Sequence, residues 1–274
     1  TGKAGLLGRI AARLSNVPIV IHTYHGHVFY GYYSPAKSWL ARRLEKVMAR
    51  ITDKNIAISD EIKRDLLSYG IANDEDIDVI PLGIDLDPYL VGGNQSGNFR
   101  GELGLDSDTY LIGIVGRIVP IKNHRLFLDA AANVVASGIS SHFAIVGDGE
   151  MRTDIERYAH ELGLSDRVTF TGWRSDLPDI YTDLDALVIS SDNEGTPVSV
   201  IEGMASGCAV VATRVGGLVD LLKHEETGFL VDPQDAEQLS EGILRVLSDS
   251  DYALRIGRSA TAAVREQYAL DRLV

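Results

Sequence analysis

Short apolar runs and amphipathic helical patterns alternate along nearly the whole chain. The apolar runs are rich in Val and Ile and predict buried strands at 17–22, 54–59, 76–81, 110–116, 142–147, 167–172, 185–190, 208–213 and 228–231. Helical patterns lie between them, among others at 36–50, 59–69, 123–136, 149–162 and 235–247. This alternation predicts an α/β fold in which parallel strands are joined by right-handed crossovers.

The alternation is interrupted between residues 85 and 108. This stretch is rich in Gly, Asn and Asp and matches neither a strand nor a helix. We therefore expect two doubly wound domains, at 1–87 and 109–274, with a linker at 88–108. The second has six predicted strands, whereas the first has about three, which is too few for a complete domain of this kind.

The composition favours an ordinary globular protein and argues against a membrane-spanning or nucleic-acid-binding one. The 274 residues are 45% hydrophobic and 24% charged, as in ordinary globular proteins, and no apolar run is long enough for a transmembrane helix. The lone cysteine, Cys208, suits a reducing compartment, so we expect a cytoplasmic protein. The net charge of −13 argues against nucleic-acid binding.

The charge is distributed unevenly. Residues 1–50 carry a net charge of +7, whereas the rest of the chain carries −20. Much of the positive charge lies in the predicted amphipathic helix 36–50, which could rest on anionic membrane at the inner face or bind an anionic acceptor. A plain solvated helix face remains the alternative.

The segment "GIVGRIVPIKNH" (113–124) follows a predicted strand and opens a helix. Ligands of open α/β sheets bind beyond the carboxyl ends of the strands. Arg117 and Lys122 lie in this turn, where a guanidinium and an ammonium beside a helix start are typical of a phosphate site. The alternative is a solvated loop with two surface cations.

Two further turns follow strands in the same half. "IVGDGEMR" (145–152) holds Gly147 and Gly149 but lacks the third glycine of a dinucleotide fingerprint, so a tight turn is as good an interpretation as a ligand site. Arg174 lies in the turn "TGWRSDLPDIY" (171–181). Both turns are expected at the same rim of the second sheet.

The segment "DNEGTPVSVIEGMASG" (192–207) contains Glu194 and Glu202, separated by seven residues. Thr196 is a suitable N-cap and Pro197 a suitable first helical residue. Glu202 should then lie about a turn and a half into the helix, on the face that packs against the sheet, where an acid needs a partner. The hydroxyls of a ribose would provide one. The alternative is one exposed glutamate and one loop acid.

A cluster of histidines and tyrosines follows the first predicted strand in "VIHTYHGHVFYGYYSP" (20–35). His22, His25 and His27 are close enough in sequence to suggest a metal site. No acid or cysteine lies near them in the sequence, so contact of one histidine with a substrate, among aromatic residues such as Tyr30, is the favoured interpretation.

Together these motifs resemble the retaining glycosyltransferases of family 4, also called group 1, which have the GT-B fold. The matching segments are "VGRIVPIKNH", "IVGDGEM", "SSDNEGTPVSVIEGMASGCAVVATRVGGLVDLL", "HEETGFLVDPQD", "IHTYHGHVF" and "AISDEIKRDLLSYGI…IDVIPLGID". The resemblance implies two Rossmann-like, doubly wound parallel-sheet domains across a cleft. It also implies that the chain starts after the first strand and glycine-rich loop of the N-terminal domain, which is therefore incomplete.

The resemblance also implies roles for individual residues. Arg117 and Lys122 would hold the donor diphosphate, Glu202 the ribose and Glu194 the transferred sugar, with His25 facing the sugar from the other domain. The other residues expected at the donor are Gly147, Gly149, Arg174, Thr196, Pro197 and Val198, and those on the acceptor side are His27 and Tyr30.

The expected reaction is transfer of a sugar from a UDP-sugar, or a GDP-sugar, to a hydroxyl of a sugar or lipid-linked acceptor with retention at the anomeric carbon. The resemblance implies neither a metal nor a cofactor beyond the nucleotide-sugar co-substrate. The alternatives are a GT-B-fold nucleotide-sugar epimerase and a non-catalytic donor-binding fragment. A nicotinamide-dependent oxidoreductase is disfavoured because no complete dinucleotide fingerprint exists.

Overall fold

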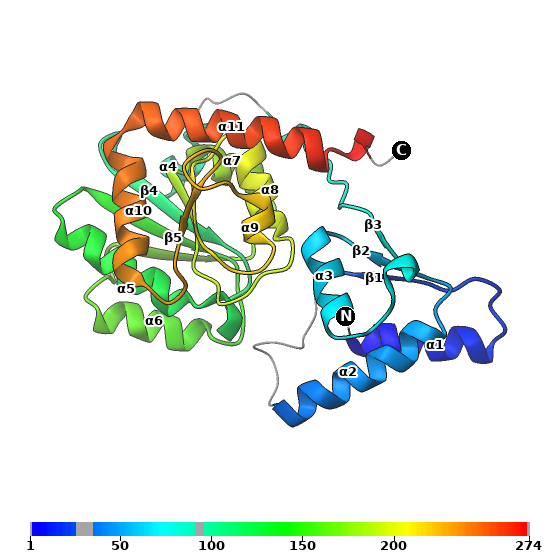
Figure 1. The fold of residues 1–274 in the computed structure, drawn as a ribbon. Coiled ribbons are helices and arrows are strands. Elements are labelled where there is room, and N and C mark those ends of the chain that lie inside the picture. Colours follow the sequence, from blue (N-terminus) through cyan, green and yellow to red (C-terminus); the bar gives the residue numbers. More distant parts are fainter. Residues whose placement is uncertain (1, 26–34, 91–95, 273–274) are drawn as a thin grey trace.

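The computed structural model describes residues 2–25, 35–90 and 96–272, which form two α/β units (Figure 1). The first unit contains a parallel sheet in the order β1-β2-β3. Its elements are α1 (Gly2–Leu14), β1 (Ile21–Tyr24), α2 (Pro35–Arg50), β2 (Lys54–Ala57), α3 (Asp60–Ser68) and β3 (Ile77–Val79). The three predicted strands of this half are therefore confirmed.

The first strand begins later than predicted. Pro18 has no N–H for a strand ladder, and the N–H of Val20 donates to the Asp53 carboxylate at 2.7 Å instead of to a strand neighbour. Pairing therefore starts at Ile21, opposite Lys54.

The second unit holds six parallel strands in the order β6-β5-β4-β7-β8-β9. The strands are β4 (Tyr110–Val115), β5 (Ser141–Val146), β6 (Val168–Gly172), β7 (Ala186–Ile189), β8 (Val210–Thr213) and β9 (Phe229–Val231). From β4 the chain adds strands on one side, and from β7 it adds them on the other. The order therefore reverses between β4 and β7, the place where doubly wound sheets bind ligands.

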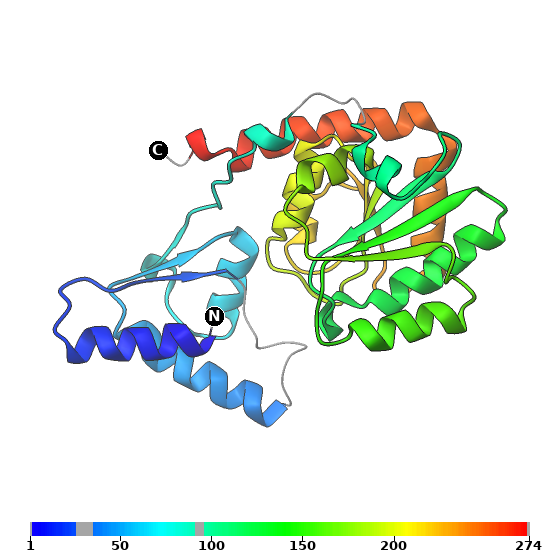
Figure 2. The ribbon, with the colours of Figure 1, turned by 180° about the vertical axis from the view of Figure 1, so that it is seen from behind.

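Helices cover both faces of this sheet (Figure 1, Figure 2). One core joins the sheet to α5 (His124–Ala136), α6 (Arg152–Glu161) and α10 (Ala236–Ser248). The other joins it to α7 (Leu177–Asp183), α8 (Val198–Ala205), α9 (Leu218–Leu221) and α11 (Ser250–Tyr268). Alternate residues of each strand enter opposite cores, which explains the continuous apolar runs in the sequence. Within the described residues, no helix is long and apolar enough to cross a membrane.

The segment predicted as a linker contains a helix. α4 (Asn98–Glu102) lies within 88–108, where no helix was expected, and its Phe99 is 1% exposed in the second unit's core. Buried Asp183 of α7 accepts hydrogen bonds from the amides of Gly97, Phe99 and Arg100 at 2.7, 2.8 and 3.1 Å. A carboxylate far away in sequence thus satisfies the amides at the start of α4, a tertiary contact that local patterns do not reveal.

Among the described residues, an ion pair and two backbone hydrogen bonds help to connect the units. Arg64 of α3 forms a 3.3 Å ion pair with Asp220 of α9. The N–H of Ile84 donates to the carbonyl of Tyr268 at 2.7 Å, and the N–H of Leu270 donates back to the Ile84 carbonyl at 3.1 Å. The end of α11 is therefore tied to the segment that leaves the first unit (Figure 1).

We predict that Asp183→Ala lowers the free energy of unfolding of the second unit by about 3 kcal/mol, because it leaves buried amides without an acceptor. Urea denaturation followed by circular dichroism measures the change. Asp179→Ala is the matched control, since Asp179 also lies on α7 and, among the described residues, its carboxylate accepts from the exposed Asn98 side chain of α4; it should cost less than about 1 kcal/mol. Equal losses in the two variants would contradict this account of α4.

Candidate functional site

Three turns at the carboxyl ends of β4, β7 and β8 are tied together by hydrogen bonds. The N–H of Asp192, after β7, donates to the carbonyl of Ile121, after β4, at 2.9 Å. The Ser190 hydroxyl donates to the Lys122 carbonyl at 2.9 Å, and the Thr213 hydroxyl of β8 donates to the Ser191 carbonyl at 2.7 Å. The three turns therefore form one polar edge beside the point where the strand order reverses.

Lys122 and Glu194 meet at this edge. The Lys122 ammonium lies 2.6 Å from a carboxylate oxygen of Glu194, and the Ser191 hydroxyl donates to the same oxygen at 2.6 Å. The Glu194 side chain is only 9% exposed. The structure thus brings together two predicted site residues from separate motifs, and the cation compensates a largely buried acid.

Arg117 follows Gly116 in the turn after β4, and its side chain is exposed. Next to this turn, His124 begins α5 with neither ring nitrogen hydrogen-bonded to another described residue. Burial and the charge of Lys122 lower the pKa of His124 to about 4, so its ring is neutral at pH 7. The positive charge of the turn is therefore carried by Arg117 and Lys122.

Glycines allow the turns to pack backbone against backbone. A Cβ on Gly216 would lie 2.0 Å from the carbonyl oxygen of Glu194, and one on Gly217 would lie 2.0 Å from that of Gly195. The N–H of Gly217 also donates to the Glu194 carbonyl at 3.0 Å. The glycines after β8 thus hold the loop that carries Glu194, and this requires the absence of side chains.

Gly147 and Gly149 allow their turn to pack closely against the turn that carries Arg117. Gly147 has φ +135°, and a Cβ there would lie 2.0 Å from the carbonyl oxygen of Gly116. A Cβ on Gly149 would lie 2.3 Å from the carbonyl oxygen of Ile118. The structure accounts for both glycines by close packing, and their contact with a donor stays a prediction.

The helix that follows Glu194 begins one residue later than predicted. Pro197 has extended dihedral angles and is itself the cap residue of α8, so Thr196 is not the N-cap and Val198 is the first helical residue. The proposed cap failed because Pro197 does not adopt helical dihedral angles. Thr196, Pro197 and Val198 still lie at the start of α8, beside the loop that carries Glu194.

Glu202 has two partners that the sequence did not reveal. The Tyr89 hydroxyl donates to one of its carboxylate oxygens at 2.9 Å, and the Tyr181 hydroxyl donates to the other at 3.0 Å. Burial raises the pKa of Glu202 above the usual range, while the two hydrogen bonds oppose that rise. The acid has the partners that its burial requires, and they are protein hydroxyls; its contact with a ribose stays a prediction.

Arg174 is engaged by other protein groups. Its guanidinium bonds both carboxylate oxygens of Glu102 at 2.6 and 2.8 Å and also bonds Asp176. These hydrogen bonds raise its pKa. The contact with Glu102 ties the turn after β6 to α4, so Arg174 has a structural role here, and its contact with a donor stays a prediction.

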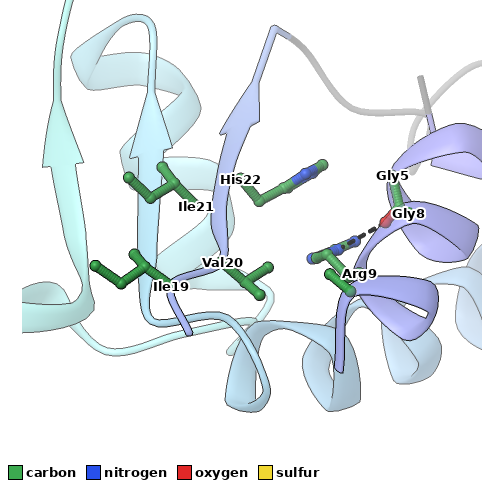
Figure 3. A pocket seen from close by; sticks show the side chains of 8 residues that line it. Gly5, Gly8, Arg9, Ile19, Val20, Ile21 and His22 are labelled. Atoms are coloured by element: carbon green, nitrogen blue, oxygen red, sulfur yellow. Dashed lines mark hydrogen bonds between the residues drawn. The ribbon is translucent and has the colours of Figure 1, made fainter. Parts of the chain in front are cut away.

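The histidine segment is described only in part. His25 is exposed just after β1, whereas His27 and Tyr30 lie outside the described residues. His22 lines a pocket of about 290 Å³ between α1 and β1, opposite Arg9 (Figure 3), and burial lowers its pKa to about 4. Within the described ranges, no three His, Cys, Asp or Glu residues are grouped as metal ligands usually are. Metal independence remains a prediction.

Two family models match the chain. Residues 95–263 match "Glycosyl transferases group 1", and residues 1–88 match "Glycosyltransferase Family 4". Among solved structures, HepE from Anabaena in complex with UDP and glucose has a TM-score of 0.89 at 24% identity and covers 100% of this chain and 74% of its own. Sucrose-phosphate synthase from Thermosynechococcus elongatus has a TM-score of 0.83 at 25% identity, covering 98% and 69%. The two-unit GT-B architecture expected from the sequence is confirmed.

Relatives that are similar in sequence are also named as glycosyltransferases. The UDP-Gal:alpha-D-GlcNAc-diphosphoundecaprenol alpha-1,3-galactosyltransferase of Escherichia coli is 32% identical over 91% of this chain and 65% of its own length. The 2-deoxystreptamine glucosyltransferase of Streptomyces kanamyceticus is 30% identical over 89% of this chain and 65% of its own length. The chain thus spans about two thirds of the length of these relatives. Because the group 1 model matches more than half of the chain and the family 4 model matches most of the remainder, the chain belongs to the glycosyl transferases of group 1.

Proposed function

We propose that the protein is a retaining hexosyltransferase, which moves a sugar from a UDP-sugar to a hydroxyl of a sugar or lipid-linked acceptor. The observation that carries the proposal is the contact between Lys122 and Glu194 at the switch point of the second sheet. A buried acid and a cation in contact can bind the two chemically different ends of a sugar diphosphate, its hydroxyls and its phosphates.

We assign the phosphates to Arg117 and Lys122. Both follow β4, and the chain from Arg117 to His124 has no acidic residue. As the bond to the sugar breaks, negative charge develops on the leaving phosphate, and preorganised cations stabilise that charge. The Lys122 ammonium has three protons, so it can bind a phosphate oxygen while it keeps its contact with Glu194.

We assign the two glutamates to the neutral parts of the donor. Glu194 would accept from hydroxyls of the transferred sugar and Glu202 from the ribose, with His25 facing the sugar from the first unit. Because Tyr89 and Tyr181 each donate to one oxygen of Glu202, ribose hydroxyls would have to share these oxygens with the tyrosines or replace them. Retention would follow if the leaving phosphate accepts the acceptor's proton on the same face of the sugar.

The relatives support a UDP donor. The Escherichia coli relative is named for UDP-Gal, and HepE has been solved with UDP, with UDP-glucose and with UDP and glucose. Their acceptors differ, from a diphosphoundecaprenol-linked sugar to 2-deoxystreptamine. A further relative, CapM of Staphylococcus aureus, is named for capsular polysaccharide biosynthesis. We therefore propose glycan, glycolipid or cell-envelope synthesis as the setting and leave the acceptor as a hydroxyl compound of that kind.

An epimerase is the second candidate reaction, and a donor-binding fragment without turnover is the third. Incubation with a UDP-hexose in the absence of acceptor separates the first two, because an epimerase releases an isomerised sugar nucleotide and a transferase does not. Binding of UDP without turnover, in the presence of a panel of acceptors, is the result expected of the fragment.

We predict that Lys122→Ala weakens UDP binding at least about tenfold, because a charge-assisted contact to phosphate is lost and Glu194 loses its cation. Isothermal titration calorimetry measures the affinity. Lys223→Ala, at an exposed lysine of the same unit, is the matched control and should bind UDP as the unmodified chain does. A Lys122→Ala variant with unchanged affinity would overturn the phosphate assignment.

The assignment of ribose to Glu202 has its own test. We predict that Glu202→Gln lowers the affinity for UDP about tenfold but has little effect on 2′,3′-dideoxy-UDP, because the carboxylate then has no hydroxyls to bind. The unmodified chain should therefore discriminate between the two nucleotides more strongly than the variant does. Equal discrimination by both proteins would show that Glu202 does not bind the ribose.

A further inference from the structure

Helix α2 (Pro35–Arg50) has an exposed apolar stripe on its outer side. Four large apolar side chains of this helix are at least 43% exposed, namely Trp39, Leu40, Leu44 and Val47. Leu40, Leu44 and Val47 follow one another at helical spacing, so they line one face of the helix. Single exposed apolar side chains are common, but a continuous exposed apolar stripe on one helix is typical of a surface that binds a protein or a membrane.

The inner side of α2 packs the helix against the first unit without the help of this stripe. Met48 and Ala49 are buried, and Ala41 packs against the core of the first unit. Glu45 pairs with Arg9 of α1 and accepts a hydrogen bond from the Tyr24 hydroxyl at 3.0 Å. The outer residues are therefore not needed for packing of the described elements. In both ribbon views α2 lies beside α1 at the lower edge of the first unit (Figure 1, Figure 2).

Positive charge surrounds the outer stripe. Lys37, Arg43, Lys46 and Arg50 are exposed on the same helix, while its single acid, Glu45, points inward. The guanidinium of Arg43 lies over the Trp39 ring at 5.2 Å. An apolar stripe with a tryptophan and flanking cations is the arrangement of a helix that lies in the interface of an anionic membrane.

We propose that the outer face of α2, centred on Leu40, Arg43 and Leu44, docks the protein on an anionic lipid surface. Charge complementarity favours this occupant over a second copy of the chain. A symmetric pair through this face would bring the cations of two copies together, and like charges across an interface are repelled. Anionic headgroups would instead attract each lysine and arginine near the surface.

The position of α2 along the chain gives the proposal a functional reason. His27 and Tyr30, which are expected on the acceptor side, precede α2 by only a few residues. A first unit held on a membrane through α2 would lie at the surface where a lipid-linked acceptor resides. Docking does not depend on the proposed transfer reaction, since it requires only the charge and apolar surface of α2.

Trp39 provides a direct readout. The chain has two tryptophans, so Trp173→Phe leaves Trp39 as the only one. We expect its emission to shift to the blue with vesicles of phosphatidylcholine and phosphatidylglycerol and to be quenched by brominated acyl chains, but to stay unchanged with phosphatidylcholine alone. No shift with either vesicle, or equal shifts with both, would overturn the proposal.

Paired variants separate a specific face from general surface charge. In cosedimentation with the anionic vesicles, Leu40→Ser with Arg43→Glu should lower the partition coefficient at least about tenfold. The matched control is Leu254→Ser with Arg258→Glu, which changes an exposed leucine and an exposed arginine of α11 and should leave partitioning within about twofold. Equal losses in both double variants would contradict the proposal.

Two further measurements test self-association of the protein and the integrity of its second unit. In sedimentation velocity without lipid, we expect no self-association through α2. Self-association that the α2 double variant removes, in a protein that does not bind vesicles, would assign the stripe to a second copy and overturn the proposal. UDP affinity should be the same in the unmodified chain and the α2 double variant, which shows that the second unit is intact. A double variant that loses vesicle binding but keeps UDP binding supports docking through α2. An unmodified chain that does not bind UDP would contradict the proposed function and leave the docking proposal unaffected.

Discussion

The candidate site depends on one contact, the ion pair between Lys122 and Glu194. An acid that is 9% exposed requires compensation by a nearby cation or hydrogen bonds. Lys122 and Ser191 provide both, while Gly216 and Gly217 let the loop after β7 sit directly on the turn after β8. Hydrogen bonds then fix that loop to the turn after β4. The protein's own contacts therefore hold the three turns of this edge together, which is what a preorganised electrostatic site requires.

The same principle explains how two acids can lie near the cations to which we assign the phosphates. Glu194 is matched by Lys122, and Glu202 is held by the hydroxyls of Tyr89 and Tyr181. Each acid therefore has a protein partner of its own. Tyr89 comes from the segment between the units, so the position of Glu202 is coupled to the path of the chain there.

Periodicity in the sequence predicted the architecture well because the strands of the second sheet other than the edge strand β6 are mostly buried and read as continuous apolar runs. It failed where a contact over a long distance in sequence decides the outcome. Asp183 organises α4, and Tyr89 and Tyr181 hold Glu202, yet nothing near these residues in the sequence indicates their partners. Likewise, the sequence does not reveal the contact of Arg174 with Glu102 of α4, and the contact of Arg174 with a donor stays a prediction.

A crystal structure of this chain with UDP tests the central assignment most directly. The account predicts β-phosphate oxygens about 3 Å from the Lys122 ammonium, within reach of the Arg117 guanidinium, and ribose hydroxyls at the Glu202 carboxylate. UDP bound away from the turn after β4, or bound there with its phosphates distant from both cations, would contradict it.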